Sequence, residues 1–536
     1  MSTRVVIIGG VAGGMSAATR LRRLDEAMHI VVLERSGHVS FANCGLPYHV
    51  GGVIARRSSL LLQTPRSLAA RFGIDVRVGT EVTSIDRDRR VVRMSAGEEF
   101  GYDWLILSPG ARPVRPPIAG IERALSLRDI EDTDALVAAV GDARTAAVIG
   151  GGFIGVEMAE NLVHRGLAVT LVEATDQCLA PLDPEMVAPV HRRIRANGVD
   201  LRLGVSVTAI DADSVTMSDG STAAADIVVA AIGVRPDTGL AAAAGLAIGE
   251  RGGILVDDHC RTSDPAIFAV GDAVEKRDAL GDEPTLVPLA NTANLQGRRV
   301  ADVIAGDGGD IRPVLGTAIV GVFGLQVAAT GWNEKRLRAA GRPYAAIHTH
   351  PMNHAGYYPG AQGLALKLLV DPESDAILGA QGVGESGVDK RIDVIATAIT
   401  GRLTASALAD LELAYAPQFG SAKDPVNMLG YVAENMRRGV VETIQWHELA
   451  AAQAAGESLI DVRTQAEFDT GSIPGAVLIP VDELRERLDE LPDGDLVVHC
   501  AVGIRGHLAA RVLMQHGRRV RNLDGGYTTW LAGTTG

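Results

Sequence analysis

Two stretches of the chain repeat one pattern of apolar and glycine residues. Residues 4–35 and 145–174 each predict an apolar strand, a glycine-rich turn, a helix of period 3.6 and a second strand. Each stretch contains an acid at the end of its second strand, Glu34 in the first copy and Glu173 in the second. This order is typical of a βαβ unit that binds a dinucleotide.

The turn glycines meet the physical demands of such a unit. The first glycine permits a tight turn, the middle one lets the backbone approach a pyrophosphate, and the third allows close helix–strand packing. The second copy has all three: Gly150, Gly152 and Gly155. In the first copy Gly9 and Gly14 fit, but Val11 stands at the middle position.

The pattern changes after residue 310. Apolar or alternating runs at 316–322, 364–370 and 376–383 precede a helix expected over 388–399. Residues 435–439 indicate a linker. A second βα pattern follows, with strands expected at 459–463, 496–499 and 520–523 and a helix at 507–516.

Composition limits the possible classes of protein. The 536 residues are 47% hydrophobic and 22% charged, which is ordinary for a folded chain with several cores. A net charge of −14 argues against binding to nucleic-acid phosphates or to an anionic membrane surface. No apolar run of 18 residues or more and no signal-peptide core occur, so we expect a cytoplasmic protein.

The spacing of the cysteines argues against a disulfide framework or a structural metal site. Cys44, Cys178, Cys260 and Cys500 are far apart, with no CxxC pair and no metal-ligand spacing. We therefore expect neither a disulfide framework nor a metal site, and we interpret Cys178 and Cys260 as structural or incidental. The pair His348 and His350 is interpreted as packing or surface residues.

Cys44 is a candidate nucleophile. A helix is expected to begin just after it, and amide dipoles at a helix start stabilise a thiolate and lower its pKa. The alternative is a buried structural cysteine. Position 49 is His49, so a CxxxxC redox pair is excluded. A single thiol must alternate with a mixed disulfide, a persulfide or a sulfenic acid.

Residues 262–273 end a strand on Gly271 and Asp272, which resembles the flavin-ribityl motif of flavoproteins with two dinucleotide-binding domains. Residues 107–110 and 231–236 resemble the crossover segments of that family. The resemblance implies FAD in the first βαβ unit and NAD(P)H in the second, and Glu173 favours NADH over NADPH because an acid repels a 2′-phosphate.

This resemblance, together with the separate βα pattern after the linker, implies an α/β fold with four parts. They are an FAD-binding domain at 1–115 and 255–310, an NAD(H)-binding domain at 116–254, an α+β dimerisation domain at 311–436 and, after a linker at 437–445, a C-terminal domain at 446–536.

The same resemblance implies the cofactor-binding residues. For FAD these are Gly9, Ala12, Gly13, Gly14, Glu34, Arg35, Ser40, Asn43, Val82, Ser108, Gly110, Gly271, Asp272, Pro288, Leu289 and Ala290. For NAD(H) they are Gly150, Gly152, Phe153, Ile154, Gly155, Glu173 and Gly233.

Residues 40–48, Ser-Phe-Ala-Asn-Cys-Gly-Leu-Pro-Tyr, resemble the coenzyme A-disulfide reductase and NADH-dependent persulfide reductase branch, and the resemblance spans residues 1–436. The coenzyme A contacts that it implies are Ser16, Arg20, Arg23, Ser40, Asn43, Arg71 and Lys423. The alternative for Arg20 and Arg23 is a solvated helix face.

Two catalytic tyrosines are implied to reach the site from the partner subunit of a homodimer. They are Tyr357, which we choose over Tyr358, and Tyr415. The alternative for both is ordinary packing at a dimer interface.

Residues 446–536 resemble a single rhodanese domain, with Cys500 at the end of a strand. Its loop would consist of Ala501, Val502, Gly503, Ile504 and Arg505. Amide N–H groups around the sulfur would stabilise a thiolate or a persulfide. In that family a loop of six residues from cysteine to arginine goes with sulfur chemistry. The alternative is an inactive binding module.

The hypothesis that joins these features is an NADH-dependent flavoprotein that reduces small persulfides or polysulfide, such as coenzyme A persulfide, through Cys44, while Cys500 handles sulfane sulfur. Coenzyme A-disulfide reductase is the alternative within the same chemistry. NADH oxidase or peroxidase is disfavoured by Asn43. A sulfurtransferase or sulfur carrier, and a non-enzymatic redox sensor, are alternatives of other classes.

Overall fold

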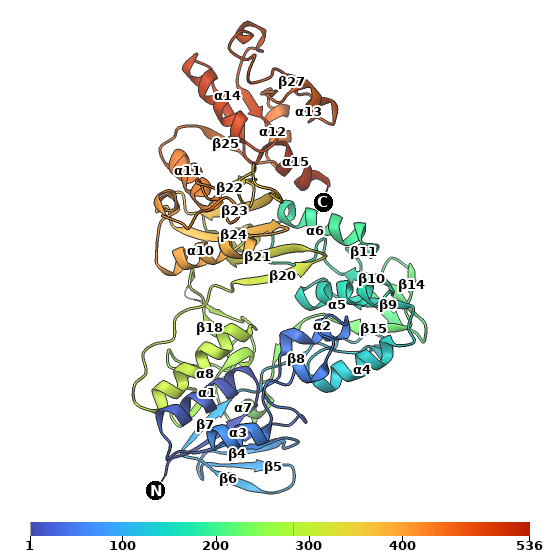
Figure 1. The fold of residues 1–536 in the computed structure, drawn as a ribbon, viewed down its shortest axis with the longest axis vertical. Helices are drawn as coiled ribbons and strands as arrows, with labels where there is room; N and C mark the ends of the chain where they lie inside the picture. Colours follow the sequence, from blue (N-terminus) through green and yellow to red (C-terminus); the bar gives the residue numbers. More distant parts are fainter. Residues whose placement is uncertain (1, 282, 536) are drawn as a thin grey trace. The chain divides into compact units, whose positions relative to one another are not determined.

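A computed structural model describes residues 2–281 and 283–535. The chain forms two compact units (Figure 1). The first joins Met1–Cys178 to Gly198–Gly316, and the second joins Leu179–Asn197 to Thr317–Gly536. Residues 179–197 thus leave the first unit and return to it, although the sequence places them inside the NAD(H)-binding half.

The first unit contains a five-stranded parallel sheet in the order β17-β7-β1-β2-β3. Its strands are β1 (Arg4–Ile8), β2 (His29–Leu33), β3 (Asp75–Arg77), β7 (Trp104–Leu107) and β17 (Ile267–Ala269). Helices α1 (Ala12–Leu24) and α8 (Ala290–Ile304) pack against each other. Val5, Ile7 and Ile106 are fully buried in this core. Strands from both ends of the unit therefore build one sheet.

A second parallel sheet in the same unit has the order β11-β10-β9-β15. Its strands are β9 (Thr145–Ile149), β10 (Ala168–Glu173), β11 (Asp200–Leu203) and β15 (Ile227–Ala230), and α5 (Phe153–His164) packs on β9 and β10. Short antiparallel sheets accompany the two parallel ones: β4 (Val82–Asp86), β5 (Val91–Met94) and β6 (Glu99–Gly101), and β12 (Val207–Ile210), β13 (Ser214–Met217) and β14 (Thr222–Ala224).

The chain directly after the first predicted crossover segment, residues 107–110, pairs with the end of the second, residues 231–236. Strand β8 (Ala111–Pro113) pairs antiparallel with β16 (Val234–Pro236), so that Arg112 lies opposite Arg235. The remaining elements of this unit are α2 (Leu46–Val50), α3 (Pro65–Phe72), α4 (Ile130–Val140), α7 (Gly239–Ala243), β18 (Lys276–Arg277) and β19 (Pro284–Thr285).

The second unit begins with a five-stranded antiparallel sheet in the order β20-β21-β24-β23-β22. Its strands are β20 (Ala318–Val322), β21 (Leu325–Gly331), β22 (Ala345–Thr349), β23 (Leu364–Val370) and β24 (Ile377–Gly384). The helices are α6 (Pro184–Ala196), α9 (Glu334–Ala339), α10 (Val388–Thr400) and α11 (Pro425–Arg437). Helix α10 starts where the sequence predicts and ends one residue later.

A parallel sheet in the order β25-β29-β28-β26-β27 completes the second unit. It contains β25 (Glu442–Ile444), β26 (Ser458–Asp461), β27 (Val477–Leu478), β28 (Leu496–His499) and β29 (Val520–Leu523). The helices are α12 (Leu449–Ala454), α13 (Gln465–Asp469), α14 (Ile504–Gln515) and α15 (Gly526–Thr535). The expected mixed α/β fold class is confirmed.

One boundary needs correction. Residues 437–445 were expected to be a linker, but β25 lies within them and pairs with β29, Glu442 opposite Arg521. Three residues are too short a run for periodicity to identify, and their pairing partner lies far along the chain. Within the described ranges, no helix has both the length and the apolar character needed to cross a membrane.

Candidate active site

The two glycine-rich turns have the same hydrogen bonds. Glu34 Oε2 accepts the Gly10 N–H at 2.7 Å, and Glu173 Oε2 accepts the Gly151 N–H at 2.6 Å. The other oxygen of each carboxylate accepts the backbone N–H two residues later, at 2.8 Å in both copies. The sequence repeat is therefore a structural repeat, with each acid fixed at the end of its second strand.

Steric limits explain two glycines of each motif. A Cβ on Gly14 would lie 2.0 Å from Gly9 O, and one on Gly155 would lie 1.8 Å from Gly150 O. The middle position differs. Gly152 has φ −73° and a Cβ there would meet nothing, and Val11 has φ −113°. The chain fold therefore accepts a side chain at the middle position, and only a bound ligand would require its absence.

Most residues predicted to bind FAD surround the first turn. Ala12 begins α1, Leu289 and Ala290 begin α8, and the Ser108 hydroxyl accepts the Gly14 N–H at 3.1 Å. Gly271 donates its N–H to Gln296 Oε1 at 2.9 Å. The sequence does not indicate Gln296, because a lone glutamine within a helix carries no motif signal.

The other predicted cofactor residues lie in strands and turns of the first unit. Gly110 and Gly233 have φ of +73° and +117°, which favour glycine. Arg35 pairs with Asp237 at 3.1 Å. Ser40 has φ +50°, and Val82 begins β4. The two glycine-rich turns, each followed by a helix start and paired with a carboxylate, fit two dinucleotides.

Cys44 lies in a short 3-10 helix, Asn43–Gly45, directly before α2, as its sequence context predicts. Its side chain is solvent-exposed. The expected low pKa is not found: desolvation by surrounding atoms raises the pKa of the Cys44 thiol, and the carboxylates of Glu157 and Asp272 raise it further, while a backbone hydrogen bond opposes them. Beside it, Asn43 Oδ1 is buried without a hydrogen-bond partner among the described residues.

Two residues near Cys44 were missed by sequence reasoning. The Tyr48 hydroxyl donates to Glu157 Oε1 at 2.9 Å. Burial raises the pKa of Glu157. Glu157 is two residues past the last glycine of the second motif, but only the fold shows that it faces the segment of Cys44.

The predicted coenzyme A residues differ in their environments. Arg20 Nε donates to Asp302 at 2.7 Å, and the Ser16 hydroxyl donates to Asn294 O at 2.9 Å. Arg23 and Arg71 are exposed on α1 and α3, and Lys423 is exposed in the second unit. Arg20 is therefore already paired, whereas the other three cations face solvent.

The two predicted catalytic tyrosines lie together in the second unit. The hydroxyl oxygens of Tyr357 and Tyr415 are 3.0 Å apart, although 58 residues separate them in the chain. The Tyr357 side chain is 75% exposed, whereas Tyr358 packs its ring edge-on against His354 at 5.7 Å. Tyr357 is therefore the more exposed of the two, since Tyr358 is 41% exposed.

Cys500 follows β28 and is fully buried. The Gly503 N–H donates to Cys500 Sγ at 3.2 Å, and α14 starts at Ile504, three residues earlier than predicted. Ala501 and Val502 complete the turn between them. The expected arrangement of cysteine, turn and helix start is present.

Charged pairs support this loop. Arg505 binds Glu467 through two hydrogen bonds of 2.8 and 2.6 Å, and this hydrogen bonding lowers the pKa of Glu467 to about 2. Buried Arg463 pairs with Asp461 at 2.6 Å. Burial lowers the pKa of His499, next to Cys500, to about 4. The guanidinium of Arg505 thus has a fixed anionic partner at the start of α14.

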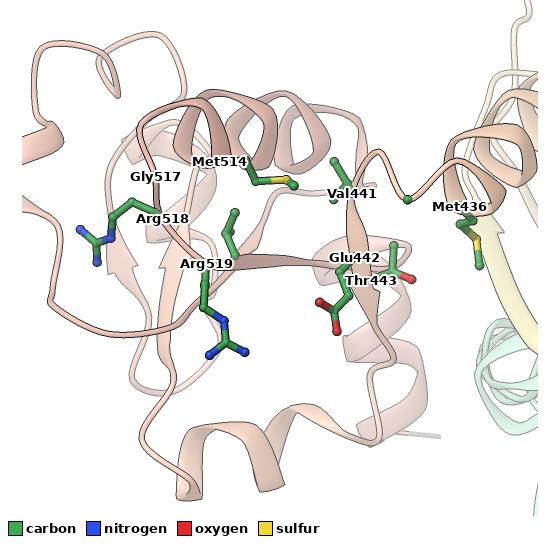
Figure 2. Close-up of a pocket in the computed structure, with 10 residues that line it drawn as sticks. Met436, Val441, Glu442, Thr443, Met514, Gly517, Arg518 and Arg519 are labelled. Atoms are coloured by element: carbon green, nitrogen blue, oxygen red, sulfur yellow. The ribbon is translucent and has the colours of Figure 1, made fainter.

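A cavity lies elsewhere in the second unit. It encloses about 690 Å³ between the end of α11 and the C-terminal parallel sheet. Met436, Glu442, Met514 and Arg519 are among its lining residues (Figure 2). It contains none of the residues predicted for catalysis.

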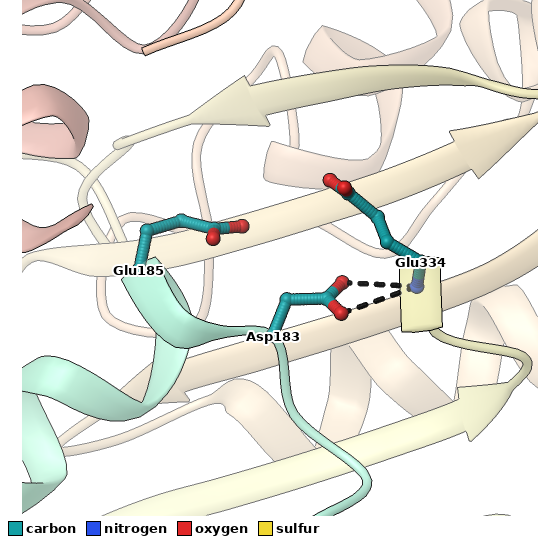
Figure 3. A group of neighbouring side chains, drawn as sticks. All are labelled: Asp183, Glu185 and Glu334. Carbon is teal, nitrogen blue, oxygen red and sulfur yellow. Dashed lines mark hydrogen bonds between the residues drawn. The ribbon is translucent and has the colours of Figure 1, made fainter. Parts of the chain in front are cut away.

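A group of buried carboxylates could be mistaken for a metal site. Asp183, Glu185 and Glu334 lie close enough to share an ion (Figure 3). However, the Lys367 ammonium contacts all three, at 2.9 Å from Asp183 Oδ2 and at 2.5 Å from Glu334 Oε1. This cluster is an internal ion-pair network.

Comparison with known proteins assigns the family. The family described as "Pyridine nucleotide-disulphide oxidoreductase" matches residues 3–297, its dimerisation domain matches 317–425, and the rhodanese-like domain matches 445–533. Coenzyme A disulfide reductase of Staphylococcus aureus strain JH9 is 34% identical over 441 residues, covering 80% of this chain and 100% of that protein.

Solved structures extend this similarity to the whole chain. Reduced Bacillus anthracis CoADR-RHD is 47% identical, with a TM-score of 0.98 over 100% of this chain and 99% of that one. An NAD-dependent persulfide reductase from A. fulgidus is 38% identical, with a TM-score of 0.93 over 98% of this chain and 100% of that one. The chain therefore belongs to the pyridine nucleotide-disulphide oxidoreductase family.

Proposed function

We propose that the protein is an NADH-dependent flavoprotein that reduces small persulfides or polysulfide, such as coenzyme A persulfide, to thiol and sulfide. Cys44 carries the reductive chemistry and Cys500 handles sulfane sulfur. The observation that carries the proposal is one chain with two different sulfur sites: an exposed single thiol with His49 at the position of a second cysteine, and a buried cysteine in a rhodanese-type loop.

In the balanced reaction, one persulfide, one NADH and one proton are converted to one thiol, one hydrogen sulfide and one NAD⁺. Cys44 attacks one sulfur of the persulfide. Attack on the inner sulfur expels sulfide and leaves a mixed disulfide with Cys44, whereas attack on the outer sulfur expels the thiol and leaves a Cys44 persulfide. Two electrons and the required protons then cleave the new S–S bond and restore the Cys44 thiol.

The cofactors fit the two glycine-rich turns. Glu34 and Glu173 would hold the ribose hydroxyls of FAD and NAD(H), with the starts of α1 and α5 facing the phosphates. Bound FAD would supply electron transfer from NADH to the sulfur on Cys44. The protein's own part is to hold the persulfide at Cys44 and to supply protons. Glu157 lies near enough to raise the pKa of the Cys44 thiol, and Tyr48 donates a hydrogen bond to Glu157.

The active unit would be a homodimer, in keeping with the matched dimerisation domain. We propose that the exposed Tyr357–Tyr415 pair enters the partner subunit's Cys44 site and donates hydrogen bonds to the departing sulfur. Lys423, Arg23 and Arg71 would bind coenzyme A phosphates as exposed cations. Two dinucleotide-binding domains, a dimerisation domain and a rhodanese domain would divide these tasks. Their boundaries would be those expected from sequence, apart from β25 and residues 179–197.

The experiment compares two substrates without oxygen. NADH oxidation is followed with coenzyme A persulfide and with coenzyme A disulfide, in the natural protein and in Cys44→Ser, with Cys178→Ser as the matched control. We expect faster turnover with the persulfide than with the disulfide, and one sulfide released per NADH oxidised. Cys44→Ser should show no turnover, whereas Cys178→Ser should behave like the natural protein. Equal or faster turnover with the disulfide would replace the proposal by coenzyme A-disulfide reductase.

The second candidate is that disulfide reductase, in which NADH and a proton convert coenzyme A disulfide to its two thiols. The name of the Staphylococcus aureus relative favours it. That relative's match covers 80% of this chain, and a plain disulfide substrate gives Cys500 no task. A sulfurtransferase would instead retain Cys500 activity when NADH is absent.

A further inference from the structure

His348 is held between two carboxylates inside the second unit. Its side chain is 1% exposed, with Nδ1 2.6 Å from Asp524 Oδ2 and Nε2 3.0 Å from Glu185 Oε1. An ionised carboxylate only accepts hydrogen bonds, so both ring nitrogens must donate. His348 on β22 is therefore an imidazolium that joins Glu185 of α6 to Asp524 of the C-terminal domain.

The surrounding charges favour this state. Glu185 also contacts Lys367, whose other partners are Asp183 and Glu334, and Arg338 contacts Glu334 on its outer side. His350 faces the same region and bonds Thr529 Oγ1 at 2.8 Å. Four buried carboxylates thus surround two buried cations, Lys367 and His348, with one further cation at the edge.

The segment that carries Asp524 continues directly to the sulfur loop. Gly525 and Gly526 have φ of +66° and +61°, and a Cβ on Gly526 would lie 2.4 Å from Cys500 O. The Tyr527 N–H donates to Cys500 O at 2.8 Å, and the Thr528 N–H donates to Ala501 O at 3.0 Å. One short segment therefore contacts His348 at one end and the backbone of Cys500 at the other.

The same carboxylate has a second role in docking. Asp524 accepts the His348 backbone N–H at 3.0 Å and the Gln445 side-chain amide at 3.2 Å. Gln445 also donates to Ala346 O at 3.1 Å. Asp524 and Gln445 therefore supply several polar contacts between the C-terminal domain and the antiparallel sheet.

We propose that His348 is a positioning residue for Cys500: by fixing Asp524, it holds residues 525–528 against the Cys500 loop and keeps the loop in the closed form in which Gly503 binds the sulfur. The sulfur site then depends on a residue of the antiparallel sheet outside its own domain. The use of this control in persulfide chemistry rests on the proposed function, whereas the mechanical coupling does not.

The coupling has a pH dependence of defined sign. Burial disfavours the imidazolium, but the charge and hydrogen bond of Asp524 and the hydrogen bond to Glu185 outweigh it and raise the pKa of His348 to about 9; Lys367 opposes them. His350 adds a cation only in acid, because burial lowers its pKa to about 4. The contact is thus intact at neutral pH and is lost as pH rises through about 9.

The test measures alkylation of Cys500 by iodoacetamide in the full chain, with Cys44→Ser as background and peptide mass spectrometry to separate the cysteines. Asp524→Asn keeps the shape of the side chain and removes its charge. Its matched control is Asp495→Asn, which removes an exposed carboxylate of the same domain that pairs with largely exposed Arg519. We expect alkylation at neutral pH to be roughly tenfold faster in Asp524→Asn because the loop opens, and unchanged in the control.

A second measurement needs no variant. Hydrogen exchange of the Tyr527 and Thr528 amides, corrected for the intrinsic effect of pH, should show protection that falls through pH about 9 in the natural chain. Two results would overturn the proposal: protection of these amides that does not change with pH, or equal rates of Cys500 alkylation in Asp524→Asn and Asp495→Asn. Neither readout uses NADH or a persulfide, so failure of the proposed enzymatic function would leave this result readable.

Discussion

The reactivity of Cys44 depends on its carboxylate neighbours. Desolvation raises the pKa of the thiol first, and Glu157 and Asp272 raise it further, so helix-start amides do not dominate here. Replacing Glu157 by Gln removes a negative charge at nearly constant shape. We predict that the pH profile of Cys44 alkylation shifts to lower pH, while Glu122→Gln, at an exposed site, leaves it unchanged. A profile that stays in place would show that Glu157 does not act on the thiol.

Two glycines of the second motif have different roles: Gly155 is needed for the fold, and Gly152 is needed only where a bound ligand approaches the backbone. In Gly155→Ala the new Cβ would meet Gly150 O at 1.8 Å, whereas in Gly152→Ala it would meet no protein atom. We predict that Gly155→Ala lowers the melting temperature and weakens NADH binding. Gly152→Ala should keep the melting temperature and raise KM for NADH on the order of tenfold, about 1.4 kcal/mol. Unchanged KM in Gly152→Ala would mean that no pyrophosphate approaches there.

The elements that the sequence predicts well are those with local signals. Both βαβ units, the helix at 388 and the strand directly before Cys500 follow from periodicity, glycine positions and length. Contacts between segments that are far apart in the sequence are harder to predict from it. Strand β25 is only three residues long. Helix α6 belongs to the second unit rather than to that of its sequence neighbours, and its Glu185 pairs with Lys367, 182 residues away.

The candidate sites show the same division. Cys44, Cys500 and both tyrosines were predicted from motifs, but Glu157, Gln296 and Asp524 were not, because their roles exist only through partners distant in sequence. His348 was interpreted as a packing or surface residue, and a lone histidine in a strand gives no sign of two buried carboxylates.

The buried ion-pair network should be a stability element of the second unit. Lys367 is fully buried, and its removal would leave three buried carboxylates without their shared cation. Breaking such a pair on one side typically costs about 3–5 kcal/mol. We predict that Lys367→Met destabilises the protein by about this amount in urea, whereas Lys390→Met, at a partly exposed pair with Asp424, costs about 0–1 kcal/mol. Equal losses would contradict a central role for Lys367.

At the scale of the whole molecule, the chain holds its two sulfur sites in different units: Cys44 in the first and Cys500 in the second. The formal charge of −14 leaves the recognition of an anionic carrier such as coenzyme A to local cations. We propose a division of labour in which Cys44 reduces sulfur and Cys500 accepts or presents it.

The most direct measurement is anaerobic NADH oxidation with sulfide counted, in the natural protein, Cys44→Ser and Cys500→Ser, with coenzyme A persulfide and with a protein-bound persulfide as donors. The account predicts that Cys44→Ser loses turnover with both donors. Cys500→Ser should keep turnover with coenzyme A persulfide and lose most of it with the protein-bound donor. Turnover in Cys44→Ser, or full activity of Cys500→Ser with both donors, would contradict it.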